Sequence, residues 1–232
     1  MIVKKRITYL PKKNMVLLIP PGLSPDEIQG LKNLNPTALL HKTDGSIKER
    51  IGITASFTES LIPEFPDFKK LMFVKNPYWR TLEIYLRKYL YRVSYDNTIT
   101  QTFKKTIEKL YGKSEIGSES ENREFVLPQN LNLTENFFIC ENFVSEFKRW
   151  FDVDINFEPR GNVGMIKKTS IYDLSMTTFS DFFDLECAEM IYEKNIEVFE
   201  KIGYDFYSYL DYHDPIRKIH VLHGNLSNKF EI

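Results

Sequence analysis

The sequence is poor in cysteine, in net charge and in long apolar runs, and each shortage excludes a class of protein. Its only two cysteines, Cys140 and Cys187, exclude a disulfide framework, and no Cys-x-x-Cys spacing suggests a zinc site. A formal net charge of −1 gives no support to a nucleic-acid partner, which calls for a basic face. No stretch approaches the roughly 20 apolar residues of a membrane span, and no signal-peptide pattern is seen. We therefore expect a reduced, cytoplasmic protein without a metal.

The chain alternates short apolar runs with longer amphipathic segments, which is typical of α/β proteins. Aromatic residues make up 14% of it and indicate a well-filled interior. The expected strands are ITYL (7–10), MVLLIP (15–20), TALLH (37–41), KLMFVK (70–75) and FFIC (137–140), with DINFE (154–158) as a further candidate. The expected helices are SPDEIQGLKNL (24–34), SIKERIG (46–52), the stretch after Pro77, TQTFKKTIEKLYG (100–112), ENFVSEFKRWF (141–151) and the long segment 180–203.

The expected organisation is a single α/β domain over residues 1–210 with a tail, 211–232, of unknown role. Within that domain the polar segment 112–124 has few apolar residues, which predicts a mobile loop.

Two basic residues, Lys75 and Arg80, flank the point in FVKNPYWRTLEIY (73–85) where a strand gives way to a helix. Helix N-termini present unpaired N–H groups and the positive end of the helix dipole, so cations placed there predict an anion site. The alternative is that both residues are solubilising charges at a surface turn.

This stretch resembles the strand–turn–helix of carbohydrate sulfotransferases that use PAPS (3′-phosphoadenosine 5′-phosphosulfate), whose pattern is roughly F-V-R-x-P-x-x-R-x-x-S-x-Y. Lys75 stands in place of the first arginine, and Pro77, Arg80 and Tyr85 match. Further segments resemble the family in the expected order, and the similarity covers roughly residues 40 to 210. They are FVLPQ (125–129), NFFICENFVSEFKRWF (136–151), NVGMIKKTSIYDL (162–174) and MIYEKNIEVFEKIGYDF (190–206).

The resemblance implies a P-loop-like sulfotransferase fold: a central, mainly parallel sheet with helices on both faces and a ligand crevice beyond the carboxyl ends of the strands. It implies in-line transfer of a sulfuryl group from PAPS, the nucleotide co-substrate, to a hydroxyl of a carbohydrate acceptor, without a metal. Lys75 and Arg80 would hold the 3′-phosphate, and Asn162 would belong to the loop that closes over the nucleotide.

Three segments compete for the loop that would bind the 5′-phosphosulfate. We prefer TALLHKTDGSIKERI (37–51), whose Lys42, Thr43, Gly45 and Ser46 supply a cation, hydroxyls and backbone N–H groups, with Lys42 stabilising the leaving phosphate as the catalytic residue. The alternative for these residues is a polar β-turn. MVLLIPPGLSPDEIQGL (15–31) has a strand, a glycine, a serine and a helix but no lysine, and ITYLPKKNMVLL (7–18) has a lysine but no glycine.

Four positions depart from the family pattern: Lys75 replaces an arginine, Glu83 a phosphate-binding serine, Phe125 a histidine and Asn195 an aspartate. A carboxylate repels phosphate, and a lysine at position 75 gives up the bidentate geometry of arginine. The departures leave the catalytic base unidentified. They also keep open an alternative function, a catalytically inactive sulfotransferase-like protein that serves as a binding or structural protein.

Overall fold

The computed structural model describes residues 3–21, 23, 25–54, 57–88, 99–111, 129–155 and 180–210. The predictions for Phe125, Asn162, the 112–124 loop and the 211–232 tail lie outside the described residues. The chain divides into two compact units. Unit 1 comprises Met1–Lys75 and Asn130–Gly161, and unit 2 comprises Asn76–Gln129 and Asn162–Ile232.

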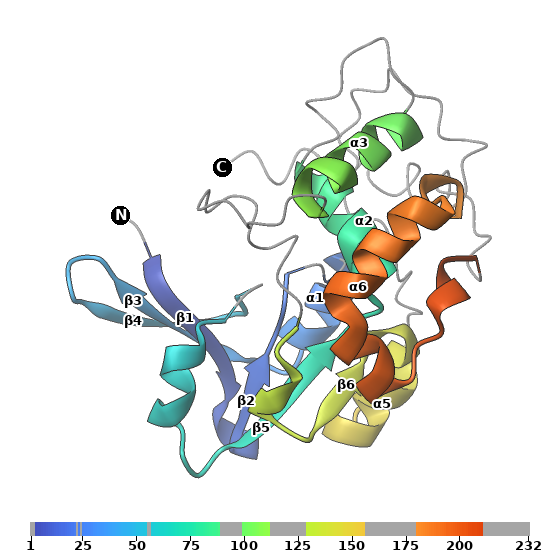
Figure 1. The fold of residues 1–232 in the computed structure, drawn as a ribbon. Coiled ribbons are helices and arrows are strands. Elements are labelled where there is room, and N and C mark those ends of the chain that lie inside the picture. The colour runs from blue at the N-terminus through green and yellow to red at the C-terminus, as the bar shows by residue number, and fades with distance from the viewer. Residues whose placement is uncertain are drawn as a thin grey trace. The chain divides into compact units, whose positions relative to one another are not determined.

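Unit 1 is built on a six-stranded mixed sheet with the strand order β4-β3-β1-β2-β5-β6 (Figure 1). In chain order the strands are β1 (Val3–Leu10), β2 (Met15–Leu18), β3 (Thr37–Lys42), β4 (Ile47–Ile51), β5 (Lys69–Val74) and β6 (Phe137–Ile139). The α/β class and the expected strands are confirmed, except for the further candidate DINFE, whose described residues 154 and 155 are not in a strand.

The expectation of a mainly parallel sheet is wrong for the described strands. Only the pairs β2–β5 and β5–β6 are parallel, whereas β1–β2, β1–β3 and β3–β4 are antiparallel. The physical reason lies in two short connections, because a turn of a few residues joins antiparallel neighbours only. Pro11–Lys13 and Asn14, whose φ is 45°, connect β1 to β2, and a turn centred on Gly45 connects β3 to β4.

The core of unit 1 joins one face of the sheet to helices α1 (Pro25–Lys32) and α5 (Phe143–Phe151). Phe73 on β5 and Phe138 on β6 lie directly opposite each other and stack with ring centroids 4.4 Å apart. Phe147 and Phe151 of α5 pack into the same cluster, and α1 contributes Leu31. Apolar residues at alternate strand positions therefore meet apolar residues at helical spacing, as the sequence pattern predicts.

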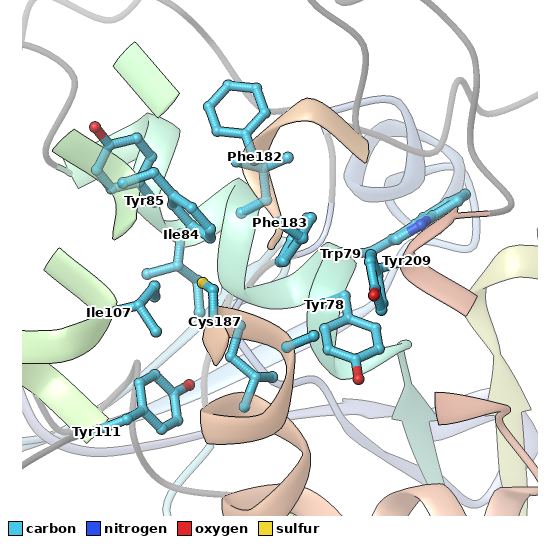
Figure 2. Close-up of a cluster of buried hydrophobic side chains, with 14 of the residues drawn as sticks. Tyr78, Trp79, Ile84, Tyr85, Ile107, Tyr111, Phe182, Phe183, Cys187 and Tyr209 are labelled. Atoms are coloured by element: carbon cyan, nitrogen blue, oxygen red, sulfur yellow. The ribbon is translucent and has the colours of Figure 1, made fainter. Parts of the chain in front are cut away.

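Unit 2 contains helices α2 (Pro77–Lys88), α3 (Ile99–Tyr111) and α6 (Leu185–Ile202) around an aromatic core (Figure 2). The Tyr78 ring meets the rings of Phe183 and Phe199 edge to face, with centroids 5.5 and 5.2 Å apart. Its hydroxyl donates a hydrogen bond of 2.9 Å to the Phe206 carbonyl. The core of unit 2 therefore also satisfies the polar group of its central tyrosine.

Helix α6 begins at an N-cap, Asp184, whose carboxylate accepts a 2.9 Å hydrogen bond from the Cys187 N–H. Burial alone would raise the pKa of Asp184, but bonds from the Lys104 ammonium and the Cys187 N–H outweigh it and lower that pKa. A lowered pKa stabilises the fold above the unfolded-state value of about 3.9, and the contribution is lost as the pH falls through the folded-state pKa.

We expect Asp184→Ala to lower the free energy of unfolding by about 1 kcal/mol at pH 7, the usual cost of a lost N-cap. Urea unfolding of both proteins at pH 7 and again well below the unfolded-state pKa of about 3.9 should show the difference shrinking in acid. Asp184→Asn keeps the capping oxygen without the charge and serves as the control. If the difference in the free energy of unfolding between the wild type and Asp184→Ala stayed constant with pH, it would contradict a lowered pKa of Asp184 in the folded protein.

Candidate functional site

The carboxyl ends of the parallel strands β2, β5 and β6 lie at one edge of the sheet of unit 1. In α/β sheets this edge is where ligands bind. Lys75 directly follows β5, and the chain leaves the neighbouring β2 at the same edge to enter α1. This edge is therefore where the geometry places a candidate site.

Lys75 and Glu27 form a buried ion pair at this edge. The Lys75 ammonium lies 3.2 Å from Oε2 and 3.4 Å from Oε1 of Glu27. The side chains are 1% and 0% exposed. The cation that the sequence assigns to a nucleotide phosphate thus already binds an anion, and that anion is a carboxylate of the same chain.

Local sequence explains how Glu27 reaches this position. Met15–Leu18 is an apolar run that is buried along its whole length, so β2 lies inside the sheet. Pro25 opens α1, where a missing N–H is tolerated, and Glu27 follows in the first turn, where the helix dipole favours a negative charge. Because β2 and β5 are parallel neighbours, the start of α1 and the end of β5 meet at the same edge.

The preferred phosphosulfate segment is a hairpin turn instead of a strand–loop–helix, since the predicted helix 46–52 is wrong and forms strand β4. The Lys42 N–H donates to the Ser46 carbonyl at 2.9 Å, and Gly45 has a φ of 81°. Asp44 accepts hydrogen bonds from Ser46, 2.9 Å from its N–H and 2.6 Å from its hydroxyl. Bonds from the Ser46 hydroxyl and N–H lower the pKa of Asp44. The Ser46 hydroxyl and the N–H groups of Lys42, Gly45 and Ser46 are thus engaged within the turn, as the β-turn alternative predicts.

Lys42 and Lys75 end strands that point the same way, but β1 and β2 separate those strands. Three strand spacings place the two residues at least about 14 Å apart across the sheet. Lys42 is half-buried at the end of β3, and Thr43, Gly45 and Ser46 are exposed. The structure does not bring the 42–46 segment together with Lys75.

Of the three competing segments, only 15–31 has the expected order of strand, loop and helix, and its strand is the parallel neighbour of β5. It ranked below 37–51 because it contains no lysine. The third segment, 7–18, crosses the hairpin between β1 and β2 and has no helix behind it beyond the 3₁₀ turn Pro11–Lys13. The strand topology therefore favours segment 15–31 over 37–51, the opposite of the preference that composition suggests.

Arg80 lies in α2 of unit 2 and is 4% exposed; the neighbouring Glu83 is 1% exposed. Both belong to a helix that is buried on nearly every side, which also carries Thr81, 3.4 Å from the Tyr111 hydroxyl. Burial raises the pKa of Tyr111, and the positive charge of Arg80 opposes that rise in part. The Arg80 side chain is therefore buried within unit 2, where its positive charge acts on Tyr111.

The start of α2 is capped by its own chain. Asn76 accepts a 2.9 Å hydrogen bond from the Tyr78 N–H and donates one of 2.8 Å to the Ser208 hydroxyl. In α6 Asn195 has a non-helical φ of −125°, and its side chain donates to the Ile191 carbonyl at 2.8 Å. Two residues in the resembling segments, Asn76 and Asn195, therefore have structural partners within unit 2.

Sequence reasoning missed Glu27, which the structure identifies as the partner of Lys75. Its one signal is an acidic residue in the first turn of the helix that follows β2, and this becomes informative only once β2 and β5 are known to be neighbours. Among the described residues no group of three or more histidine, cysteine, aspartate or glutamate side chains is placed to hold a metal ion. Nor is any helix in those ranges long and apolar enough to cross a membrane.

No model of a known protein family matches the chain, and neither a curated protein nor a solved structure is similar to it. The geometry defines an α/β protein with a mixed sheet and an ion pair at the carboxyl edge of its parallel strands.

Proposed function

We propose that the chain is a sulfotransferase-like α/β protein that has no PAPS turnover and serves as a binding or structural protein. The observation that carries this proposal is the buried pair between Lys75 and Glu27. A phosphate at Lys75 would lie beside the Glu27 carboxylate or displace it. Two like unit charges 4 Å apart repel by about 4 kcal/mol at an effective dielectric constant near 20. The carboxylate therefore opposes the anion that the resemblance implies.

Two further features support a site without turnover. The hydroxyl and N–H of Ser46 bond to Asp44, and the segment has no helix behind it. The Tyr78 N–H at the start of α2 bonds to Asn76, so this donor is already engaged. Lys75 and Ser46, two of the residues to which the resemblance gives a phosphate-binding role, thus each have an intramolecular partner of suitable chemistry.

A second candidate is an active sulfotransferase that transfers a sulfuryl group from PAPS to a hydroxyl of a carbohydrate. The observation that favours it is the order of β2, residues 19–24 and α1, set beside the parallel strand β5. A strand–loop–helix unit of this kind offers backbone N–H groups to an anion. In this candidate Lys75 exchanges Glu27 for a phosphate when the donor binds.

Calorimetry with PAP, the desulfated product nucleotide, tests the proposal. We expect no binding heat for the wild-type protein at PAP concentrations up to about 1 mM, which corresponds to a binding free energy weaker than about −4 kcal/mol. We expect Glu27→Gln, which removes the repelling carboxylate and keeps Lys75 charged, to gain measurable affinity. Micromolar binding by the wild type would overturn the proposal.

If the wild type does bind PAP, Lys75→Arg, Lys75→Met and the exposed-site control Lys48→Met show whether the nucleotide binds at Lys75, as the second candidate requires. In the active enzyme Lys75→Met should weaken binding about tenfold or more through the loss of a charge-assisted contact, whereas Lys75→Arg and Lys48→Met should retain it. Circular dichroism establishes beforehand that each variant is folded. Equal affinity in all three variants would place the nucleotide away from Lys75.

A further inference from the structure

Strand β4 forms an exposed edge of the sheet in the described part of the chain (Figure 1). It pairs with β3 on one side, and all five of its residues, Ile47–Ile51, are exposed. Ile47 and Ile51 retain 61% and 82% of their accessible surface. Exposed edge strands with β-branched residues are templates for a further strand.

At every second residue of β4 the backbone N–H and C=O groups point away from the sheet. Ser46 accepts a hydrogen bond from Lys42, and Gly52 donates one to Pro36, at the two ends of the pairing with β3. In an antiparallel ladder the hydrogen-bonded positions alternate. The backbone N–H and C=O groups of residues 48 and 50 therefore point toward β3, as the Ser46 C=O and the Gly52 N–H do. The N–H and C=O groups of Ile47, Glu49 and Ile51 point away from the sheet.

The side chains of β4 give its two faces different chemistry. Ile47, Glu49 and Ile51 share one face, and there the Glu49 carboxylate accepts a 3.1 Å hydrogen bond from the Tyr9 hydroxyl of β1. Lys48 and Arg50 share the other face and give it two positive charges two residues apart. A strand added to β4 would therefore meet two cations on one face, and on the other two isoleucines with Glu49 between them.

A second copy of the chain fits this edge poorly. Two β4 strands paired antiparallel across a two-fold axis perpendicular to the sheet bring residues of the same face opposite one another. Centred on Glu49, that arrangement sets Glu49 against Glu49 and Lys48 against Arg50. Centred on Lys48 or Arg50, it sets a cation against itself. Like charges directly opposite destabilise a strand pair, so the charges disfavour self-pairing.

We infer that β4 is a docking site for an extended, acidic segment of a partner protein, which adds to the sheet as a further strand. Its acidic residues lie opposite Lys48 and Arg50, and its apolar residues, on the other face, lie opposite Ile47 and Ile51. Main-chain hydrogen bonds supply affinity, and the opposite charges supply the choice of partner. This inference concerns the far edge of the sheet and does not depend on the function proposed for the Lys75 edge.

The probe is a fluorescein-labelled octapeptide of alternating valine and glutamate, blocked at both ends, with fluorescence anisotropy measured at low salt, where surface charges are least screened. Its matched control is the octapeptide of alternating valine and lysine, which has the same length and pattern. Opposite-charge pairs at two positions should make the wild-type protein bind the glutamate peptide about tenfold more tightly. The Lys48→Glu/Arg50→Glu variant should reverse this preference.

A backbone test separates strand addition from simple charge attraction. Glu49→Pro removes an outward N–H and leaves the pairing of residues 48 and 50 with β3 in place, because proline is tolerated at the open side of an edge strand. Its control, Glu49→Thr, removes the same carboxylate and keeps the N–H. We expect Glu49→Pro to lose glutamate-peptide binding and Glu49→Thr to retain it, with both variants folded by circular dichroism.

Four results would overturn the inference. The first is the absence of binding to the glutamate peptide by the wild-type protein. The second is equal binding of the two peptides, and the third is unchanged binding by a folded Glu49→Pro variant. A homodimer in sedimentation analysis that Ile51→Lys dissociates would likewise overturn it, because the edge would then belong to a second copy.

Discussion

Lys75→Met is expected to lower the free energy of unfolding by about 3–5 kcal/mol, because it leaves a buried carboxylate without its cation. Glu27 is 0% exposed and Lys75 1%, so water offers neither group a substitute partner. The methionine side chain fills a similar volume, so that the change removes charge with little loss of packing. Urea unfolding at pH 7, followed by tryptophan fluorescence, measures the difference.

The double variant Lys75→Met/Glu27→Leu shows whether the loss arises from the unpaired charge. Replacing both members of a buried pair by apolar residues is often neutral or stabilising, so we expect the double variant to recover most of the stability lost by Lys75→Met. Lys48→Met, at an exposed position of β4, should change stability by no more than about 0.5 kcal/mol. A loss below about 1 kcal/mol in Lys75→Met would contradict a buried pair.

The same pair shows which part of the site was predictable from the sequence. Lys75 was identified because a basic residue ends an apolar strand and precedes a strong helix, and these are local signals. Its partner is 48 residues away along the chain. That contact depends on β2 and β5 being parallel neighbours, and no local pattern encodes which strands pair. The sequence could therefore place Lys75 at the edge of the sheet. It could not show that Lys75 is buried there in an ion pair with Glu27.

The segment 46–52 shows a different cause of error. Ile47 and Ile51 are four residues apart, a spacing that places both on one face of a helix and equally on one face of a strand. Length does not separate the two structures in so short a segment. The preceding turn decides, because Asp44 and Gly45 supply the side-chain acceptor and the positive φ that close a hairpin. The turn chemistry is evident in the sequence, but Gly52, taken as a helix stop, favours a short helix over residues 46–52.

Longer elements were predicted well because their signals are repeated. Apolar residues recur at helical spacing through α2, α3 and α6, and Gly203, whose φ is 84°, ends α6 where the sequence places its stop. Each such helix contains several turns, so one misleading residue changes little. The parallel or antiparallel sense of neighbouring strands has no comparable repetition and was expected from the family resemblance alone. The mixed arrangement of parallel and antiparallel strands was therefore the part of the fold that the sequence could not predict.

Phe138→Ala is expected to be the most damaging change in the core of unit 1, with a loss of about 3–5 kcal/mol in the free energy of unfolding. The ring is 0% exposed and stacks on Phe73 at 4.4 Å, with Phe143 at 5.1 Å. Its removal opens a cavity between β5, β6 and α5 that rigid aromatic neighbours fill poorly, so the transfer and cavity terms add.

Val144→Ala on α5, at a position that is 38% exposed, is the matched control for Phe138→Ala and should cost less than about 1 kcal/mol. Phe138→Leu keeps much of the volume and should lie between the two. Urea unfolding measures all three, and backbone hydrogen exchange locates the loss. If the stacked rings hold β5 to β6, amide protection in Phe137–Ile139 should fall in Phe138→Ala and persist in Val144→Ala. Equal protection in both variants would show that the strand pairing is independent of this aromatic contact.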